Sequence, residues 1–340
     1  MQTIKLEEHS VKYVPISQTG SSIEYWDVKK FKKKLNIKVV NVDKEDMSME
    51  FDLINIGTPF VNAFRRVLLS EVPTMAIEKV HVYNNTSIIQ DEILAHRLGL
   101  VPLKADPRKF SFPKNLENDA ITNPEECLEF QLKVTCKRNA KLSTRSTDDD
   151  FRDCKNTEVH SNLIKWVPIG EQALKFKPED VEPIHDNILV AKLRPGHELD
   201  LKLIAVKGIG KDHAKFQPVA TASYRLLPQI TLEEVVQGEK AQRLKASFSP
   251  GVVKLTTENN IITAKINNPR YDSCSRNVFQ HEDLKDIVKI SRVPNHYIFT
   301  IESVGALSPN TLFLESIQVL RGKCDKLLSE IKAKGKNCFL

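Results

Sequence analysis

The chain has 340 residues, which is too long for one ordinary hydrophobic core and favours two domains. Hydrophobic residues make up 41% and charged residues 28%, as in globular proteins that fold in water. No stretch approaches the ~20 apolar residues of a membrane span, and the first ten residues, MQTIKLEEHS, lack the apolar centre of a signal peptide. We therefore expect a protein of the cytosol or nucleus that does not bind a membrane.

The formal net charge of +6 is mild for this length, because a dedicated nucleic-acid-binding protein concentrates more positive charge on one face. One dense basic run stands out, and it consists of Lys29, Lys30, Lys32, Lys33, Lys34 and Lys38. Two interpretations remain open for it. It is either a solvated segment that leads into a strand, or an address for nuclear import.

The cysteines do not predict a metal site. The six are Cys127, Cys136, Cys154, Cys274, Cys324 and Cys338, and no two form the C-x-x-C pairs of closed zinc sites. No two histidines lie three or four residues apart, and the acidic triplet Asp148–Asp150 lacks the alternating ligands and the glycine turn of a calcium loop. We expect free thiols, a solvated acidic triplet, no metal and no cofactor.

Residues 1–36 show no clear periodicity and predict an extended or partly ordered arm. Two apolar runs follow, around 37–42 and 47–53, and the second alternates strictly as in a half-buried strand. The polar residues DKED separate the two runs. This arrangement predicts a β-hairpin.

A helix is expected next, with Thr58 as its N-cap, Pro59 in its first turn and Pro73 beyond its end. Its apolar residues form one stripe, made of Phe60, Val61, Phe64, Val67 and Leu68. Arg65 and Arg66 lie off this stripe. Either they are simply exposed to solvent, or they contact a partner protein, since guanidinium groups are favoured at interfaces.

The middle of the chain predicts short strands around 76–83 and a helix over 91–98 that ends at Gly99. Residues 104–185 are loop-rich, but the alternating runs 128–134 and 199–205 predict strands. Gly208-Ile-Gly210-Lys211 does not have the spacing of a phosphate-binding loop, and Asp212 follows the lysine. A glycine turn between strands is the prediction here.

The strongest periodic signal lies near the C-terminus. Ser308 and Pro309 predict a helix start, and a heptad-like seam follows at Phe313, Ile317, Leu320, Cys324, Leu327 and Ile331. The seam suits a partner helix, but ordinary helices that pack on their own sheet show similar spacing. Periodicity leaves both interpretations open.

Three motifs resemble the alpha-like subunits of cellular RNA polymerases. They are residues 62–73 (NAFRRVLLSEVP), residues 90–103 (QDEILAHRLGLVPL), and a third set made of LRPG (193–196), KGIGKDHAKF (207–216) and TASYR (221–225). The second motif is similar to the archaeal and eukaryotic members. The third is similar to the branch shared by RNA polymerases I and III, and the resemblance runs over most of residues 37–335.

The resemblance implies an α+β fold, in which a discontinuous dimerisation domain (37–75 and 226–340) is interrupted by a mostly β inserted domain (76–225). It also implies a non-catalytic scaffold subunit of the nucleus, including the nucleolus, for rRNA, tRNA and 5S RNA transcription. The seam would then bind the smaller alpha-like subunit, and Arg65 and Arg66 would contact the second-largest subunit. Small zinc-binding subunits are implied neighbours, and DNA is reached only through the complex.

One departure bears on the branch. Archaeal relatives and the RNA polymerase II counterpart can carry clustered cysteines in the inserted domain, whereas this chain has only Cys127, Cys136 and Cys154 there. This sparse set favours the I and III branch, with the polymerase II or archaeal type as the alternative. A free-standing nucleic-acid binder rests on the lysine run alone, and no constellation of residues supports a metabolic enzyme.

Overall fold

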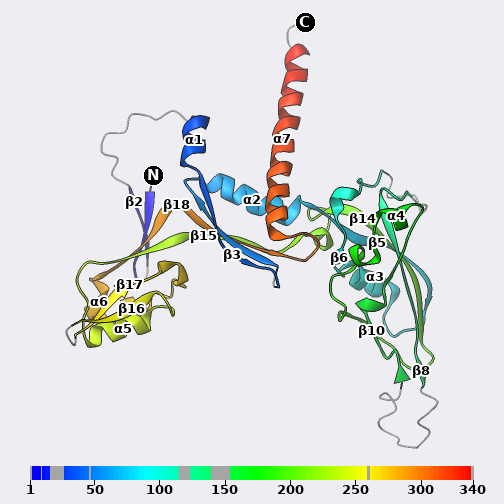
Figure 1. Cartoon of the computed structure of the whole chain (residues 1–340), viewed down its shortest axis with the longest axis horizontal. Coiled ribbons are helices and arrows are strands. Elements are labelled where there is room, and N and C mark those ends of the chain that lie inside the picture. Colours follow the sequence, from blue (N-terminus) through cyan, green and yellow to red (C-terminus); the bar gives the residue numbers. More distant parts are fainter. Residues whose placement is uncertain are drawn as a thin grey trace, which may run out of the picture. The chain divides into compact units, whose positions relative to one another are not determined.

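The computed structural model describes residues 2–8, 10–15, 27–45, 47–114, 123–138, 154–258 and 261–337. Helices and antiparallel sheets are mixed along the chain, which confirms the α+β prediction (Figure 1). The helices are α1 (Val28–Lys34), α2 (Thr58–Ser70), α3 (Asp91–Gly99), α4 (Gln172–Lys175), α5 (Glu239–Ser247), α6 (Glu282–Lys285) and α7 (Pro309–Asn337). None of those in the described ranges is long and apolar enough to cross a membrane.

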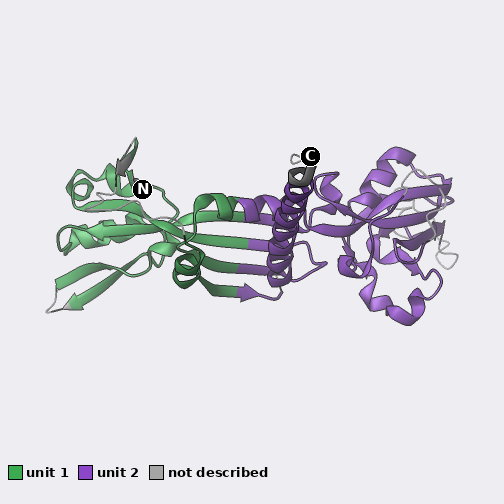
Figure 2. Ribbon diagram, turned by 90° about the horizontal axis from the view of Figure 1, so that it is seen from above, with its two compact units in different colours: residues 1–41, 50–62, 223–300 green, residues 42–49, 63–222, 301–340 purple. Residues whose placement is uncertain are grey.

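The chain divides into two compact units, coloured separately in Figure 2. The first comprises residues 1–41, 50–62 and 223–300, and the second comprises 42–49, 63–222 and 301–340. Both units are therefore built from segments that are far apart in the sequence. The domain boundaries given above stay a prediction.

A four-stranded antiparallel sheet forms the centre of the second unit. Its order is β11 (Lys165–Val167), β7 (Cys127–Thr135), β14 (Glu198–Ile209) and β5 (Pro73–Asn85). The alternating runs 128–134 and 199–205 lie in β7 and β14, and Leu128, Leu132, Leu199 and Leu203 are fully buried. Such side chains stabilise the fold by ~1.5 to 3 kcal/mol each, because burial removes their apolar surface from water.

Short elements surround this sheet, as the loop-rich prediction for 104–185 requires. Six short strands form three two-stranded sheets: β6 (Leu103–Lys104) with β12 (Glu182–Pro183), β10 (Glu158–His160) with β13 (Leu189–Lys192), and β8 (Lys137–Arg138) with β9 (Cys154–Lys155). Helix α3 begins at Asp91 and includes Gly99, as the sequence predicts, and buries Leu94 and Leu98 in the same core. The acidic triplet 148–150 lies outside the described residues.

The structure corrects one expectation for this unit and refines another. The residues around 76–83 belong to one strand of 13 residues, β5, since pairing with β14 continues over its whole length. Gly208 lies inside β14, where a Cβ would come within 2.6 Å of the Phe216 ring. Gly210 passes so close to the end of α2 that a Cβ would lie 2.5 Å from the carbonyl oxygen of Leu69. Close packing accounts for Gly208 inside the strand, whereas Gly210 lies in the turn that follows β14, as predicted.

The first unit contains a sheet of order β2 (Val11–Pro15), β1 (Gln2–Leu6), β18 (Val288–Ser303), β4 (Ser48–Ile54) and β3 (Asn36–Asp43), with β15 (Val219–Leu232) paired to β18. The predicted hairpin over 37–53 is confirmed as β3 and β4. The described part of the arm 1–36 is ordered as the extended strands β1 and β2 and the short helix α1, which agrees with a partly ordered arm. Residues Lys5 and Leu6 pair with Ser291 and Ile290.

A second core lies in this unit beneath α5, α6 and the hairpin of β16 (Val253–Glu258) and β17 (Ile261–Ile266). Leu244, Val252 and Leu284 are fully buried there. Elsewhere in the unit the partly buried Arg270 guanidinium forms an ion pair with the buried Asp52 and lies 2.6 Å from the Glu50 carboxylate. Because a charge buried without a partner is costly, this cluster fixes the 269–271 turn against β4.

Candidate protein interface

Helix α2 shows which of its residues are available to a partner. Val61, Val67 and Leu68 are buried, as the stripe predicts, but Phe60 is 47% exposed and contradicts it. Phe60 lies in the first turn, where its ring is 6.3 Å from that of Phe31. A ring in the first turn can therefore lie against the half-buried ring of Phe31 instead of entering the core.

The two arginines of α2 differ in exposure. Arg65 is half-buried and Arg66 is exposed. Both lie off the buried stripe, as predicted. Their role in binding a partner is not decided by this placement, because solvent exposure and partner contact both require it.

Helix α7 begins with a well-formed cap and a packed first part. The Ser308 hydroxyl lies 2.8 Å from the Thr311 hydroxyl, and the backbone N–H of Leu312 donates to the carbonyl of Ser308 at 3.0 Å. Leu312, Phe313 and Ser316 are buried, and the Phe313 ring meets the Phe64 ring edge-on at 5.3 Å. The start of the helix therefore packs within its own chain.

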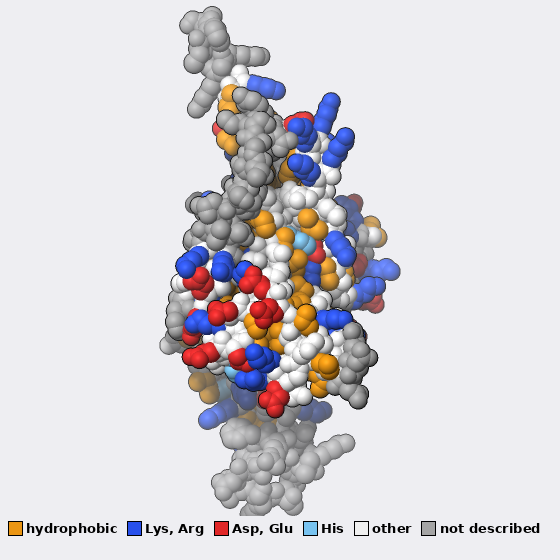
Figure 3. Space-filling model, turned by 90° about the vertical axis from the view of Figure 1, so that its left-hand side faces the viewer, with side chains coloured by type: hydrophobic (Ala, Val, Ile, Leu, Met, Phe, Trp, Pro, Cys, Tyr) orange, Lys and Arg blue, Asp and Glu red, His pale blue; other side chains and the backbone are white. Residues whose placement is uncertain are grey.

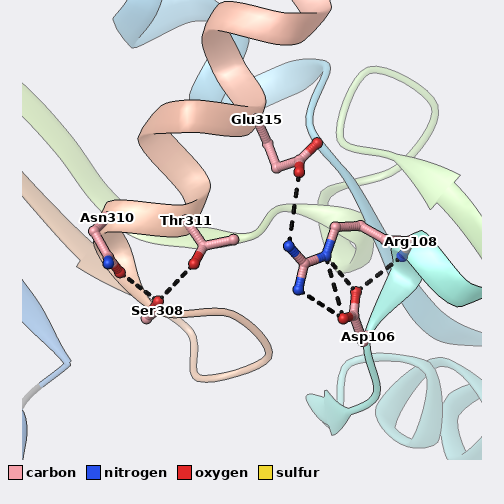
Figure 4. A network of polar contacts seen from close by, with 6 residues as sticks. All are labelled: Asp106, Arg108, Ser308, Asn310, Thr311 and Glu315. Carbon is pink, nitrogen blue, oxygen red and sulfur yellow. Dashed lines mark hydrogen bonds and ion pairs between the residues drawn. The ribbon is translucent and has the colours of Figure 1, made fainter.

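A polar network holds this first part of α7 beside the segment 106–110 (Figure 4). Asp106 accepts hydrogen bonds from the Arg108 side chain at 2.7 to 3.2 Å, and the Arg108 guanidinium reaches Glu315 of α7 at 4.0 Å. Burial disfavours the ionised form of Asp106, but the hydrogen bonds from Arg108 outweigh it and hold the Asp106 pKa below its usual value. No local pattern in the sequence predicts this network, because Glu315 lies far along the chain from Asp106 and Arg108.

Lys207 adds a second positive group near the same place. Its ammonium donates to the carbonyl of Phe110 at 2.9 Å and lies 5.0 Å from the centre of the Phe112 ring. Burial lowers the pKa of Lys207, although the nearby carboxylates of Glu315 and Asp106 favour its charged form. The base of α7 is thus held by apolar packing together with opposite charges.

The remainder of α7 is exposed. Every side chain from Arg321 to Ala333 is exposed to solvent, and Figure 1 shows this part of the red helix without another ribbon beside it. Lys323 forms an ion pair with Glu71 at 2.7 Å, so the polar contacts continue one turn beyond the packed part.

The predicted seam is therefore divided between two environments. Phe313 is buried, and Ile317 and Leu320 are half-buried. Further along, Cys324 is exposed, Leu327 is 59% exposed and Ile331 is 66% exposed. The first half of the seam packs on this chain, whereas the second half leaves a row of apolar side chains in water.

Additional apolar residues enlarge this exposed surface. Leu314 and Leu328, which the heptad pattern places beside the seam, are 61% and 54% exposed. Large apolar side chains that gather on one exposed helix are typical of protein–protein interfaces. The sequence contained this signal, since both leucines continue the apolar pattern of the helix.

No chemistry is brought together elsewhere in the described ranges. Among residues 2–8, 10–15, 27–45, 47–114, 123–138, 154–258 and 261–337, no group of three or more His, Cys, Asp or Glu side chains gathers to hold a metal ion. Cys127 and Cys136 are buried, and burial, with smaller contributions from nearby acidic residues, raises the pKa of Cys127 to about 11. The candidate site is a binding surface.

Comparison with known proteins identifies the family. Residues 50–324 match the RNA polymerase Rpb3/Rpb11 dimerisation domain. The chain belongs to the alpha-like RNA polymerase subunits. It is a structural subunit of the polymerase complex and not an enzyme by itself. The exposed half of α7 is thus part of a protein whose family is defined by dimerisation.

The relatives distinguish the branches of this family. The human DNA-directed RNA polymerases I and III subunit RPAC1 is 50% identical over 91% of this chain and 88% of its own length. The Saccharomyces cerevisiae RPAC1 is 44% identical, with 89% of each chain covered. The Arabidopsis thaliana subunit 3 of RNA polymerases II, IV and V is 32% identical over 83% of this chain and 87% of its own. The higher identities confirm the resemblance to the I and III branch.

Proposed function

We propose that this chain is the larger alpha-like subunit of RNA polymerases I and III and heterodimerises with the smaller alpha-like subunit through the exposed part of α7. The observation that carries the proposal is the row Cys324, Leu327 and Ile331, which the fold leaves uncovered on a helix whose base is fixed. A second alpha-like chain would present a similar surface across a pseudo-twofold axis. The nucleus, including the nucleolus, is then the site of action.

The energetics of such an interface follow from exposure. Phe313 is already buried in the isolated chain and has little surface left to lose. The gain comes from Leu327 and Ile331 and from the flanking Leu314 and Leu328, each more than half exposed. At ~25 cal/mol per Å² of apolar surface these residues supply several kcal/mol, before the costs of association are subtracted.

We further propose that Arg65 and Arg66 contact the second-largest subunit of each polymerase. The support is their position off the buried stripe of α2, which leaves the exposed Arg66 available without any change in the core. Arginine suits this role because its planar guanidinium binds carboxylates in a bidentate manner. The small zinc-binding subunits would lie near the same assembly, and DNA would be reached only through the complex.

Co-expression tests the proposed function. With the smaller alpha-like subunit, the chain should purify as a 1:1 complex, whereas alone it should self-associate or have poor solubility because the surface of α7 is uncovered. A stable monomer that does not bind that subunit would contradict the proposal. Binding to the RNA polymerase II counterpart of the smaller subunit instead would point to the alternative branch.

A further inference from the structure

The basic helix α1 has no role in the interface described above. It spans only Val28–Lys34, and no residue in it is buried. Lys29, Lys30, Lys32, Lys33 and Lys34 are all exposed. Figure 3, seen from the left-hand side of Figure 1, shows several Lys and Arg side chains gathered near the top of the molecule.

A cap, an aromatic contact and a side-chain hydrogen bond hold α1 in place. Asp27 caps the helix by accepting a hydrogen bond from the backbone N–H of Lys29 at 2.9 Å. The half-buried Phe31 meets the exposed Phe60 ring at 6.3 Å, and the side-chain amide of Asn55 donates to the carbonyl of Lys34 at 2.8 Å. Helices of fewer than ~12 residues are marginal in water without burial, so this segment unfolds at little cost.

The arrangement of the lysines disfavours recognition of the helix itself. At about 100° per residue, the five lysines cover an arc of about 200°, and Phe31 lies on the opposite side. A single phosphate backbone lies along only part of such an arc. In an extended chain, by contrast, Lys29, Lys30 and Lys32 project at intervals along a line, and each can enter a separate acidic pocket.

We propose that residues 29–34 bind a nuclear import receptor as an extended, lysine-rich peptide, released from the α1 conformation. This inference rests on the proposed function, because a subunit of nuclear polymerases has to enter the nucleus. The sequence Lys29-Lys30-Phe31-Lys32 supplies closely spaced ammonium groups, and acidic grooves bind such groups by charge. The segment precedes residue 50, where the match to the dimerisation domain begins.

The experiment measures binding of the full chain, in complex with the smaller alpha-like subunit, to purified importin α. One variant replaces the five lysines of α1 by glutamine, which keeps helix propensity and removes the charge. The matched control makes the same replacement at five exposed lysines outside α1: Lys155, Lys175, Lys211, Lys240 and Lys245. Both variants lose the same net charge, so a difference between them depends on position.

The α1 variant should bind importin α at least about tenfold more weakly, because loss of several charge pairs costs more than the ~1.4 kcal/mol of a tenfold change. The control should bind as the unmodified complex does. Both should retain the smaller alpha-like subunit, so loss of that subunit would count against the proposed function and not against this inference. Equal importin binding by the α1 variant and the control overturns the inference.

A third variant, Phe31→Pro, tests the extended conformation. Proline disrupts the helix but leaves all five lysines in place, so binding to importin α should persist. If Phe31→Pro abolishes binding, the receptor does not read an extended segment and the inference is wrong. A 20-base-pair DNA duplex serves as the competing probe: if α1 binds the duplex and not importin α, the segment is a nucleic-acid contact.

Discussion

Replacing Leu327 and Ile331 together by glutamine should weaken the heterodimer without changing the fold. The two side chains are 59% and 66% exposed, so they contribute little to the folded state of the isolated chain. Full burial of such a side chain is worth ~1.5 to 3 kcal/mol, and the part still exposed accounts for about six-tenths of it. The pair should therefore contribute about 2 to 4 kcal/mol to association.

The expected effect is a rise in the dissociation constant by about 30- to 700-fold, since 1.4 kcal/mol corresponds to a factor of ten. Titration calorimetry against the smaller alpha-like subunit measures it, and thermal unfolding should show a shift equivalent to less than ~0.5 kcal/mol, as for other surface changes. The matched control replaces Leu174 and Val235, which are 86% and 72% exposed on other elements. If this control weakens binding as much as the α7 variant does, or if neither does, the assignment of the interface is refuted.

Three other expectations follow from the structure. Arg66→Ala should melt normally and retain the heterodimer but fail to recruit the second-largest subunit, at a cost of ~2 to 5 kcal/mol of binding. By contrast, Leu68→Ala, at a fully buried position, should lose ~2 to 5 kcal/mol of fold stability. If Arg66→Ala assembles the full polymerase, Arg66 is simply exposed to solvent and contacts no partner. Elemental analysis of the isolated chain should find no stoichiometric zinc or iron, and one tightly held equivalent would show the interpretation of the cysteines to be wrong. The lowered Asp106 pKa stabilises the fold above the carboxyl group's unfolded pKa of ~3.9, and this stability is lost as the pH falls through the lower folded value. Arg108→Gln should therefore reduce the loss of unfolding free energy between neutral and strongly acidic pH. If the variant loses as much unfolding free energy as the unmodified chain, Asp106 does not contribute to the acid sensitivity of the fold.

Local signals in the sequence predicted the elements that local interactions determine. The start of α2 at Thr58, the end of α3 at Gly99 and the hairpin over 37–53 each depend on caps, glycine or alternation within a few residues. The family motifs predicted the function, which periodicity alone does not indicate. Residues 62–73 resemble the alpha-like subunits, which the helical periodicity of the same segment does not indicate.

Pairing between distant segments limited the prediction elsewhere. The run Gln2–Leu6 has too few residues for a clear pattern, and it becomes a strand because Leu6 pairs with Ile290 and is buried in a core of residues from 230–290. The length of β5 likewise follows from its partner β14. The Arg108–Glu315 contact joins segments that no sequence window contains together.

The seam of α7 shows a related limit. Its spacing predicted an apolar face from Phe313 to Ile331, and spacing is the same whether the neighbour is the chain's own core or another protein. Only the three-dimensional structure divides it, with Phe313 buried and Ile331 exposed. The contacts of Phe64 and Glu71 with the base of α7 determine where the division falls.

Chemical labelling of Cys324 tests the central claim most directly. Cys324 is the exposed thiol among the cysteines of the described residues and lies within the seam, whereas the buried Cys127, with its raised pKa, is an internal unreactive reference. In dilute chain, maleimide should modify Cys324 rapidly, and the rate should fall as the smaller alpha-like subunit is added, reaching a plateau at one equivalent. A labelling rate for Cys324 that stays unchanged in an otherwise intact 1:1 complex would contradict the account, because the heterodimer would then leave the seam of α7 open to solvent.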